Sequence, residues 1–168
     1  MALALGLTVA ACAEILPVGP AEAVAEATDD LFVFTVRSPA NRYASGAPIV
    51  VGAELVYQGP KARETIYHAS SPVGWQLAQL DGPAVMGGGM DEPCLNTDLE
   101  RGAAQVVPFQ KAGVVDDVGP FDRAWFEDRV LRLPAGRWRI SAELGVALGD
   151  CGGEPHALEA SIELLVTP

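Results

Sequence analysis

Basic residues are scarce in this 168-residue chain, in which 11 lysines and arginines stand against 22 aspartates and glutamates, for a formal net charge of −11. Only Lys61 and Lys111 are lysines, and the first basic residue of either kind is Arg37. An acidic surface repels phosphate backbones and anionic lipid headgroups. The composition therefore argues against nucleic-acid binding and against electrostatic docking on a membrane.

The common catalytic signatures are also missing. The sequence contains no G-x-S-x-G nucleophile elbow, no H-E-x-x-H, no phosphate-binding loop and no dinucleotide fingerprint. His68 and His156 are the only histidines, so the usual general base is scarce, and we interpret both as surface or hydrogen-bonded structural residues. We expect neither catalysis nor a bound cofactor. An envelope enzyme whose carboxylates cannot be picked out among so many acidic residues stays the alternative.

Long apolar runs are absent too, because Glu14 ends the first uncharged segment well short of the roughly 20 residues that span a bilayer. That segment ends in Val9-Ala10-Ala11-Cys12, with small residues directly before the cysteine. Residues 5–13 resemble the signal peptide and lipobox of a bacterial lipoprotein. The resemblance implies that residues 1–11 are removed, that Cys12 is acylated, and that the protein is anchored at the extracytoplasmic face of the cell membrane.

The signal segment departs from the family pattern in one respect, because signal peptides normally open with Lys or Arg and none precedes Arg37. We therefore expect the true translation start to lie before Met1. The alternative is that residues 2–13 form a buried helix or strand of a cytoplasmic domain. The preference for Arg over Lys, with abundant Ala, Gly and Pro, is typical of a GC-rich bacterial genome such as that of an actinobacterium.

Three cysteines would leave one unpaired thiol in an exported protein, but acylation of Cys12 leaves Cys94 and Cys151 as a pair. We expect a disulfide between them, with two buried free thiols as the alternative. The residues from 81 to 103 should then run along the domain, as an extra strand or as irregular chain that covers an edge. The Cα atoms of the two cysteines should lie within about 7 Å of each other.

Residues 12–30 are predicted to be a lipid-anchored acidic linker, since residues 13–30 carry five carboxylates and no cation. The part from Ala21 to Thr28 has the composition of a weak helix, without an apolar stripe to hold it against a domain. The folded domain is predicted to span residues 31–168.

From Leu31 onward, short runs with period-two alternation are separated by Gly, Pro and Asp, which predicts an all-β domain. The predicted strands are 31–37, 49–57, 64–69, 74–80, 104–109, 129–133, 137–148 and 157–166. The hairpin at 133–140, which places Trp138 and Ile140 on one face, and the segment 43–59 resemble parts of bacterial immunoglobulin-like domains. The resemblance implies an immunoglobulin-like antiparallel β-sandwich of about seven to eight strands, with Trp138 in its core.

Two segments are candidate binding sites. Met86 and Met90, close to Cys94, offer soft ligands of the kind that bind Cu(I), with a glycine loop whose methionines fill the core as the alternative. Phe121, Trp125 and Phe126 lie on a predicted short helix. We expect this helix to close one end of the sandwich, or else to present the three aromatics as a patch that contacts a partner.

Taken together, the sequence predicts a lipid-anchored protein of the cell envelope that acts as a non-catalytic binding or structural module. Its expected partners are the membrane, through the anchor, and an unidentified envelope protein or ligand. An extracytoplasmic copper carrier that uses Met86 and Met90 is the rival in a different class.

Overall fold

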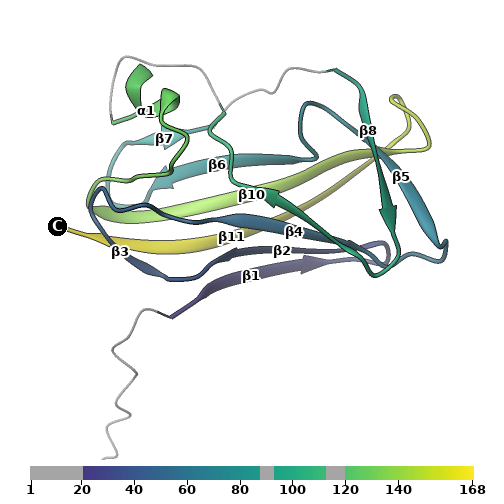
Figure 1. Ribbon diagram of the computed structural model, residues 1–168, viewed down its shortest axis with the longest axis horizontal. Coiled ribbons are helices and arrows are strands. Elements are labelled where there is room, and N and C mark those ends of the chain that lie inside the picture. The colour runs from purple at the N-terminus through teal and green to yellow at the C-terminus, as the bar shows by residue number, and fades with distance from the viewer. Residues whose placement is uncertain (1–20, 88–92, 113–119) are drawn as a thin grey trace, which may run out of the picture.

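Two β-sheets packed face to face make up the domain (Figure 1), and the computed structural model describes residues 21–87, 93–112 and 120–168. The first sheet has the order β1-β2-β4-β9. The second sheet has the order β3-β11-β10-β5-β8, and β6 also pairs with β10 and carries β7 at its other edge. The strands of the described ranges are β1 (Ala23–Thr28), β2 (Phe32–Ser38), β3 (Arg42–Ala44), β4 (Gly52–Tyr57), β5 (Arg63–His68), β6 (Val73–Gln79), β7 (Val85–Met86), β8 (Leu95–Glu100), β9 (Ala104–Pro108), β10 (Gly136–Leu148) and β11 (Glu154–Thr167).

The all-β sandwich predicted from the sequence is confirmed, with more strands than the seven or eight expected. All the strand pairs are antiparallel except one, because β3 runs parallel to the last residues of β11. The second sheet is therefore mixed rather than wholly antiparallel.

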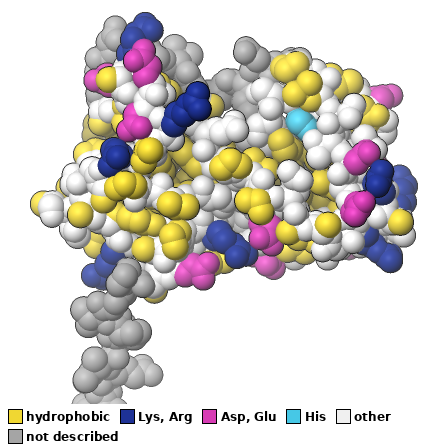
Figure 2. Space-filling model, viewed as in Figure 1, with side chains coloured by type: hydrophobic (Ala, Val, Ile, Leu, Met, Phe, Trp, Pro, Cys, Tyr) yellow, Lys and Arg dark blue, Asp and Glu magenta, His cyan; other side chains and the backbone are white. Residues whose placement is uncertain are grey.

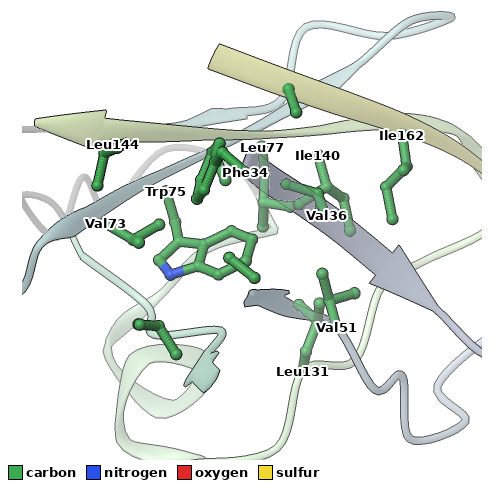
Figure 3. Close-up of a cluster of buried hydrophobic side chains, with 14 of the residues drawn as sticks. Phe34, Val36, Val51, Val73, Trp75, Leu77, Leu131, Ile140, Leu144 and Ile162 are labelled. Carbon is green, nitrogen blue, oxygen red and sulfur yellow. The ribbon is translucent and has the colours of Figure 1, made fainter. Parts of the chain in front are cut away.

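The core lies between the sheets, and Figure 3 shows apolar side chains from both sheets pointing toward one another there. The alternation expected in the predicted strand 49–57 is present, since Ile49, Val51, Ala53, Leu55 and Tyr57 are all buried. Only Gly52–Tyr57 of that run forms a strand, and Ile49 makes an isolated bridge to Leu131.

Trp138 is a core residue, as predicted, with none of its surface exposed. Its ring packs 5.8 Å from the ring of Phe121, and its indole nitrogen donates a hydrogen bond to the Pro134 carbonyl at 3.0 Å. The hairpin register predicted from the alternation of Trp138 and Ile140 is therefore confirmed.

The β10–β11 hairpin extends through the whole second sheet and defines two ends of the domain. Gly136 pairs with Val166 at one end and Leu148 with Glu154 at the other, where the turn contains Cys151. The chain enters at the first of these ends, since Asn41 donates to the Ala21 carbonyl and accepts from the Leu165 amide. We call this the entry end and the end with Cys151 the hairpin-turn end.

The predicted linker 12–30 is wrong over residues 23–28, which form β1, neither linker nor helix. Ala23, Ala25 and Ala27 face the core, whereas Val24 and Glu26 face solvent. β1 packs against β11 across the gap between the two sheets, a close approach that small side chains permit. The domain therefore begins before Leu31.

The predicted strand 129–133 is also wrong, because only Leu131 forms a bridge, to Ile49. The carbonyls of Trp125, Asp128 and Val130 all accept hydrogen bonds from the Lys111 ammonium, at 2.5, 2.6 and 3.0 Å. The ammonium also lies 4.0 Å from the centre of the Trp125 ring. Within the predicted strand, the Val130 carbonyl is directed to this cation and not to a neighbouring strand. Burial lowers the pKa of this lysine, and the Asp128 carboxylate opposes the shift.

The predicted aromatic helix is α1 (Arg123–Glu127), and it closes the entry end of the sandwich. Asp122 caps it by accepting a hydrogen bond from the Trp125 amide. Phe121 is buried, its ring 4.3 Å from that of Trp125, and both Trp125 and Phe126 are half-buried against the core. Of the two interpretations of this helix, the packing matches the one in which it covers the core.

The described residues of the range 81–103 include strands at two edges of the second sheet, β7 beside β6 and β8 beside β5. A disulfide joins Cys94 and Cys151, whose Cα atoms lie 5.9 Å apart. The Leu80 amide donates a hydrogen bond to the Arg137 carbonyl, near the entry end. From there the chain passes to the hairpin-turn end, as the sequence predicted.

At the edge formed by β8, acidic and basic side chains lie next to one another on the face shown in Figure 2. Arg63 of β5 lies 3.5 Å from Asp98 and 3.1 Å from Glu100 of β8. Charged side chains on an edge strand discourage unwanted pairing with another chain.

Candidate functional site: a groove on the outer face of the second sheet

The site begins with an interruption in the strand order along one edge of β10. Residues Trp138–Leu144 of β10 pair with β6, and Ala147 and Leu148 pair with β5. Between these two ladders, the Gly145 amide donates instead to the carbonyl of Pro72, in the loop that joins β5 to β6. In that loop the Ser71 hydroxyl binds both the amide and the carbonyl of Val73, so the chain turns before β6 begins.

Over this interruption lies a groove of about 660 Å³, at the hairpin-turn end of the domain. Its volume lies within the range of about 300 to 1,000 Å³ that is usual for ligand pockets. Residues that line it include Tyr67, Cys94, Gly145, Ala147, Cys151 and Ala157. The floor is made of small residues, because Gly145 of β10 pairs with Ala157 of β11 and Ala147 pairs with Pro155. The disulfide and Tyr67 form its sides.

Gly145 leaves the floor of the groove open. A Cβ atom placed on it would meet no atom of the described residues within 4 Å. Its backbone is not in the left-handed region, so a larger residue would be tolerated there without strain. The space above Gly145 is therefore accessible to a ligand group and is not needed for packing of the domain.

Two carboxylates face each other beside the small-residue floor. Glu143 of β10 pairs directly with Glu159 of β11, and both side chains are exposed. Directly opposed side chains in an antiparallel pair have Cβ atoms about 4.5 to 5.5 Å apart, and like charges there are destabilising. Within the described ranges, neither carboxylate lies within ion-pair distance of a basic side chain.

The opposite situation holds nearer the entry end of the same face. Glu163 lies 3.0 Å from Arg139 and 3.3 Å from Arg137. Hydrogen bonds and charge from Arg139, and then from Arg137, hold the pKa of the Glu163 carboxyl below its usual range. On the outer face of the hairpin, the carboxylate near the entry end is thus paired with two arginines, whereas the two carboxylates beside the groove have no such partner in the described part of the chain.

Beneath the groove, His156 connects the two sheets. Its imidazole packs edge-on against Phe32 of the first sheet, with ring centres 4.9 Å apart, and its Nε2 lies 2.6 Å from an Asp29 oxygen. The other Asp29 oxygen accepts from the Leu31 and Phe32 amides, at 2.8 Å each. Burial alone would raise the pKa of Asp29, but these amides and the nearby imidazole hold it below its usual value. This group fixes the floor of the groove to the rest of the core.

His68 lies at the side of the groove with both ring nitrogens engaged. Nδ1 lies 2.7 Å from the Ala69 carbonyl and Nε2 lies 2.9 Å from the Thr97 hydroxyl. If Nδ1 carries the proton, it donates to the carbonyl and Nε2 accepts from the hydroxyl, so a neutral imidazole satisfies both contacts. His68 and His156 therefore have structural partners, as the sequence interpretation proposed.

The two methionines of the copper hypothesis are not both described. Met86 is buried in the core as part of β7, and Met90 lies outside the described residues. Cys94 is held in the disulfide and is not available as a thiolate ligand. In the part of the chain that the structure describes, no three His, Cys, Asp or Glu side chains gather as a metal site would require.

The lipidation candidate Cys12 also lies outside the described residues. Across the described ranges, no helix has the length and apolar character needed to cross a membrane.

Of the residues predicted as sites, the structure brings Cys94 and Cys151 together beside the groove, whereas Phe121, Trp125 and Phe126 lie at the entry end. Sequence reasoning missed Glu143, Gly145, Glu159 and Lys111. A comparison with known proteins found no matching family model, no similar curated protein and no similar solved structure.

Proposed function

We propose that this chain is a non-catalytic binding module of the cell envelope, anchored through an acylated Cys12 at the extracytoplasmic face of the membrane. Its groove binds an envelope protein or ligand. The observation that carries the proposal is the position of the groove, at the end of the domain opposite to the one where the chain enters.

The distances favour this arrangement. Ten residues, 13–22, separate Cys12 from the first strand, and they can span at most about 35 Å. The chain enters the domain near Leu165, and Pro155 of the groove lies ten residues away on the same strand, or about 33 Å. The attachment point and the groove are thus separated by the length of the domain, so the tether leaves the groove free for envelope partners.

The chemistry of the groove supports binding rather than catalysis. Its floor is apolar and small, and the histidine at its side is engaged through both nitrogens. A histidine that acts as a general base needs a free ring nitrogen in reach of a substrate proton. Shape and charge, rather than a reacting side chain, are what the groove offers to a ligand.

The anchor is tested by intact-mass analysis of protein extracted from membranes of the native host. We expect a diacylglyceryl adduct on the wild-type protein and its loss in Cys12→Ser, because two acyl chains hold a domain stably where one does not. An unmodified product in the cytosolic fraction would refute the anchor.

The binding role is tested by crosslinking in living cells. A photoreactive phenylalanine analogue is placed at Tyr67 in the groove and, as a matched control, at Val24 on the outer face of the first sheet. We expect a discrete crosslinked product from position 67 and none from position 24. Equal products from both positions, or none from either, would contradict a binding role for the groove.

A further inference from the structure

The unpaired carboxylates and the open floor of the groove lie on the same strands at a regular spacing. Glu143, Gly145 and Ala147 are successive outward positions of β10, and Glu159 and Ala157 are their neighbours on β11. Alternate residues of a strand repeat every 6.6 to 6.8 Å or so, which is also the spacing of alternate side chains in an extended peptide. A peptide lying along the hairpin would place every second side chain over this row.

We propose that the groove binds an extended segment of a partner protein in which a basic side chain and an apolar side chain lie two residues apart. The basic group lies between Glu143 and Glu159, and the apolar side chain occupies the space over Gly145 and Ala157. The inference deepens the proposed function, on which it rests, by naming the chemistry of the partner.

Charge complementarity determines where the basic side chain of the ligand lies. Two carboxylates that face each other without a counterion repel, and a lysine or arginine placed between them relieves this repulsion. On the same face, Glu163 already has Arg137 and Arg139 as partners, so a basic ligand group gains little there. The unpaired charge thus directs the ligand to the half of the face that contains the groove.

The open floor of the groove determines where the apolar side chain of the ligand lies. Among the described residues, no atom occupies the place of a side chain over Gly145, and the adjacent outward positions on the side away from Glu143 are Ala147 and Ala157. A ligand side chain that fills this space buries apolar surface against the floor, Tyr67 and the disulfide. Because the floor is rigid backbone of a long hairpin, the domain loses little conformational freedom on binding.

The test uses the full chain carrying Cys12→Ser and three blocked six-residue peptides. In the first peptide, Arg-Ser-Leu-Ser-Arg-Ser, arginine and leucine lie two residues apart and so share one face of an extended chain. In the second peptide glutamate replaces every arginine, and in the third serine replaces the leucine. Binding is followed by titration with NMR detection of backbone amides. We expect the first peptide alone to bind and to shift the amides of Gly145, Ala147 and Ala157.

Variants then separate the two contacts. Each of Glu143→Gln and Glu159→Gln should weaken binding about two- to fivefold, as expected for an exposed ion pair. Glu26→Gln, on the outer face of the first sheet, changes the net charge equally and should have no effect. Raising the salt concentration should weaken binding of the wild type, because the charges are exposed to solvent.

Gly145→Leu fills the space over the floor and should reduce binding about tenfold or more, with Ala157→Leu as a second variant of the same kind. Gly52→Leu, an outward strand glycine of the first sheet, is the matched control. Equal binding of the glutamate or serine peptide, no binding of any peptide, or binding unaffected by both floor variants would overturn the inference. If a crosslinked partner were still captured at Tyr67, the failure would concern the peptide chemistry and not the binding role.

Discussion

Replacing Lys111 by methionine tests the cation that organises the segment around α1. Methionine keeps an apolar chain of similar length and removes the ammonium that binds the carbonyls of Trp125, Asp128 and Val130. The segment from Phe121 to Leu133 contains a single short helix and one isolated bridge, so these contacts are its main connection to the chain at Lys111.

The expected cost follows from the three acceptors and the indole ring. A hydrogen bond to a charged group contributes about 1.5 to 3 kcal/mol when fully formed, and a cation over an aromatic ring about 0.5 to 1 kcal/mol. Lys111 is half-buried, and after loss of the ammonium the freed carbonyls can bind water, so only part of this sum is lost. We expect Lys111→Met to lower the free energy of unfolding by about 2 to 3 kcal/mol.

Equilibrium unfolding in urea measures this loss, and hydrogen exchange locates it, with amides of residues 120–133 expected to lose protection first. Lys61→Met is the matched control, because the Lys61 side chain is exposed and its ammonium lies 2.8 Å from a single carboxylate, that of Glu64, and binds no group of carbonyls among the described residues. Its unfolding midpoint should equal that of the wild type. Equal midpoints for both lysine variants, with unchanged exchange in 120–133, would refute the role assigned to Lys111.

Four further changes test the packing of the domain. Trp138→Ala should cost about 3 to 5 kcal/mol in urea unfolding, since the ring is fully buried. The Cys94–Cys151 disulfide joins residues 57 positions apart in the sequence, so its reduction should lower the free energy of unfolding by up to about 4 kcal/mol, measured by unfolding with and without reductant. The lowered pKa of Asp29 means that its carboxylate stabilises the fold above the usual value of 3.8 and that this stabilisation is lost as the pH falls through the lower folded-state value. Asp29→Asn should therefore flatten the loss of stability below about pH 4 in acid titrations followed by circular dichroism. Ala25→Leu should cost about 1 to 3 kcal/mol in thermal unfolding, because β1 packs closely against β11.

The strands with a clear alternation of large apolar residues were predictable. In β4 and β10 every second side chain is buried and the others face solvent or a half-buried surface. When one face of a strand is buried, a shift of one residue would expose all of its apolar side chains. The apolar pattern in the sequence therefore specifies the register of the strand. The Trp138 hairpin followed from the same reasoning, whereas the disulfide was predicted from the number of cysteines and its path from the order of the strands.

The missed strands lack such an alternation. β1 buries a row of alanines, whose side chains carry little strand signal, and β8 buries only Leu99 among its six residues. Both lie at or near sheet edges and are held by their neighbours, which the local sequence does not reveal. The opposite error, a predicted strand at 129–133, arose because the sequence does not reveal that the Lys111 ammonium binds the Val130 carbonyl of this segment and the Asp128 carbonyl just before it.

Part of the groove could be predicted from the sequence. The glycines and the aspartate around Cys151 mark a turn, and residues equally distant from Cys151 then pair, which places Glu143 opposite Glu159. What the hairpin does not show is that β5 and β6 share one edge of β10 and leave Gly145 between them. That interruption depends on where the loop before Val73 turns, and on a disulfide that brings Cys94 beside the floor. The pairing of the two carboxylates therefore follows from the local sequence of the hairpin, whereas the space beside them results from contacts between distant segments of the chain.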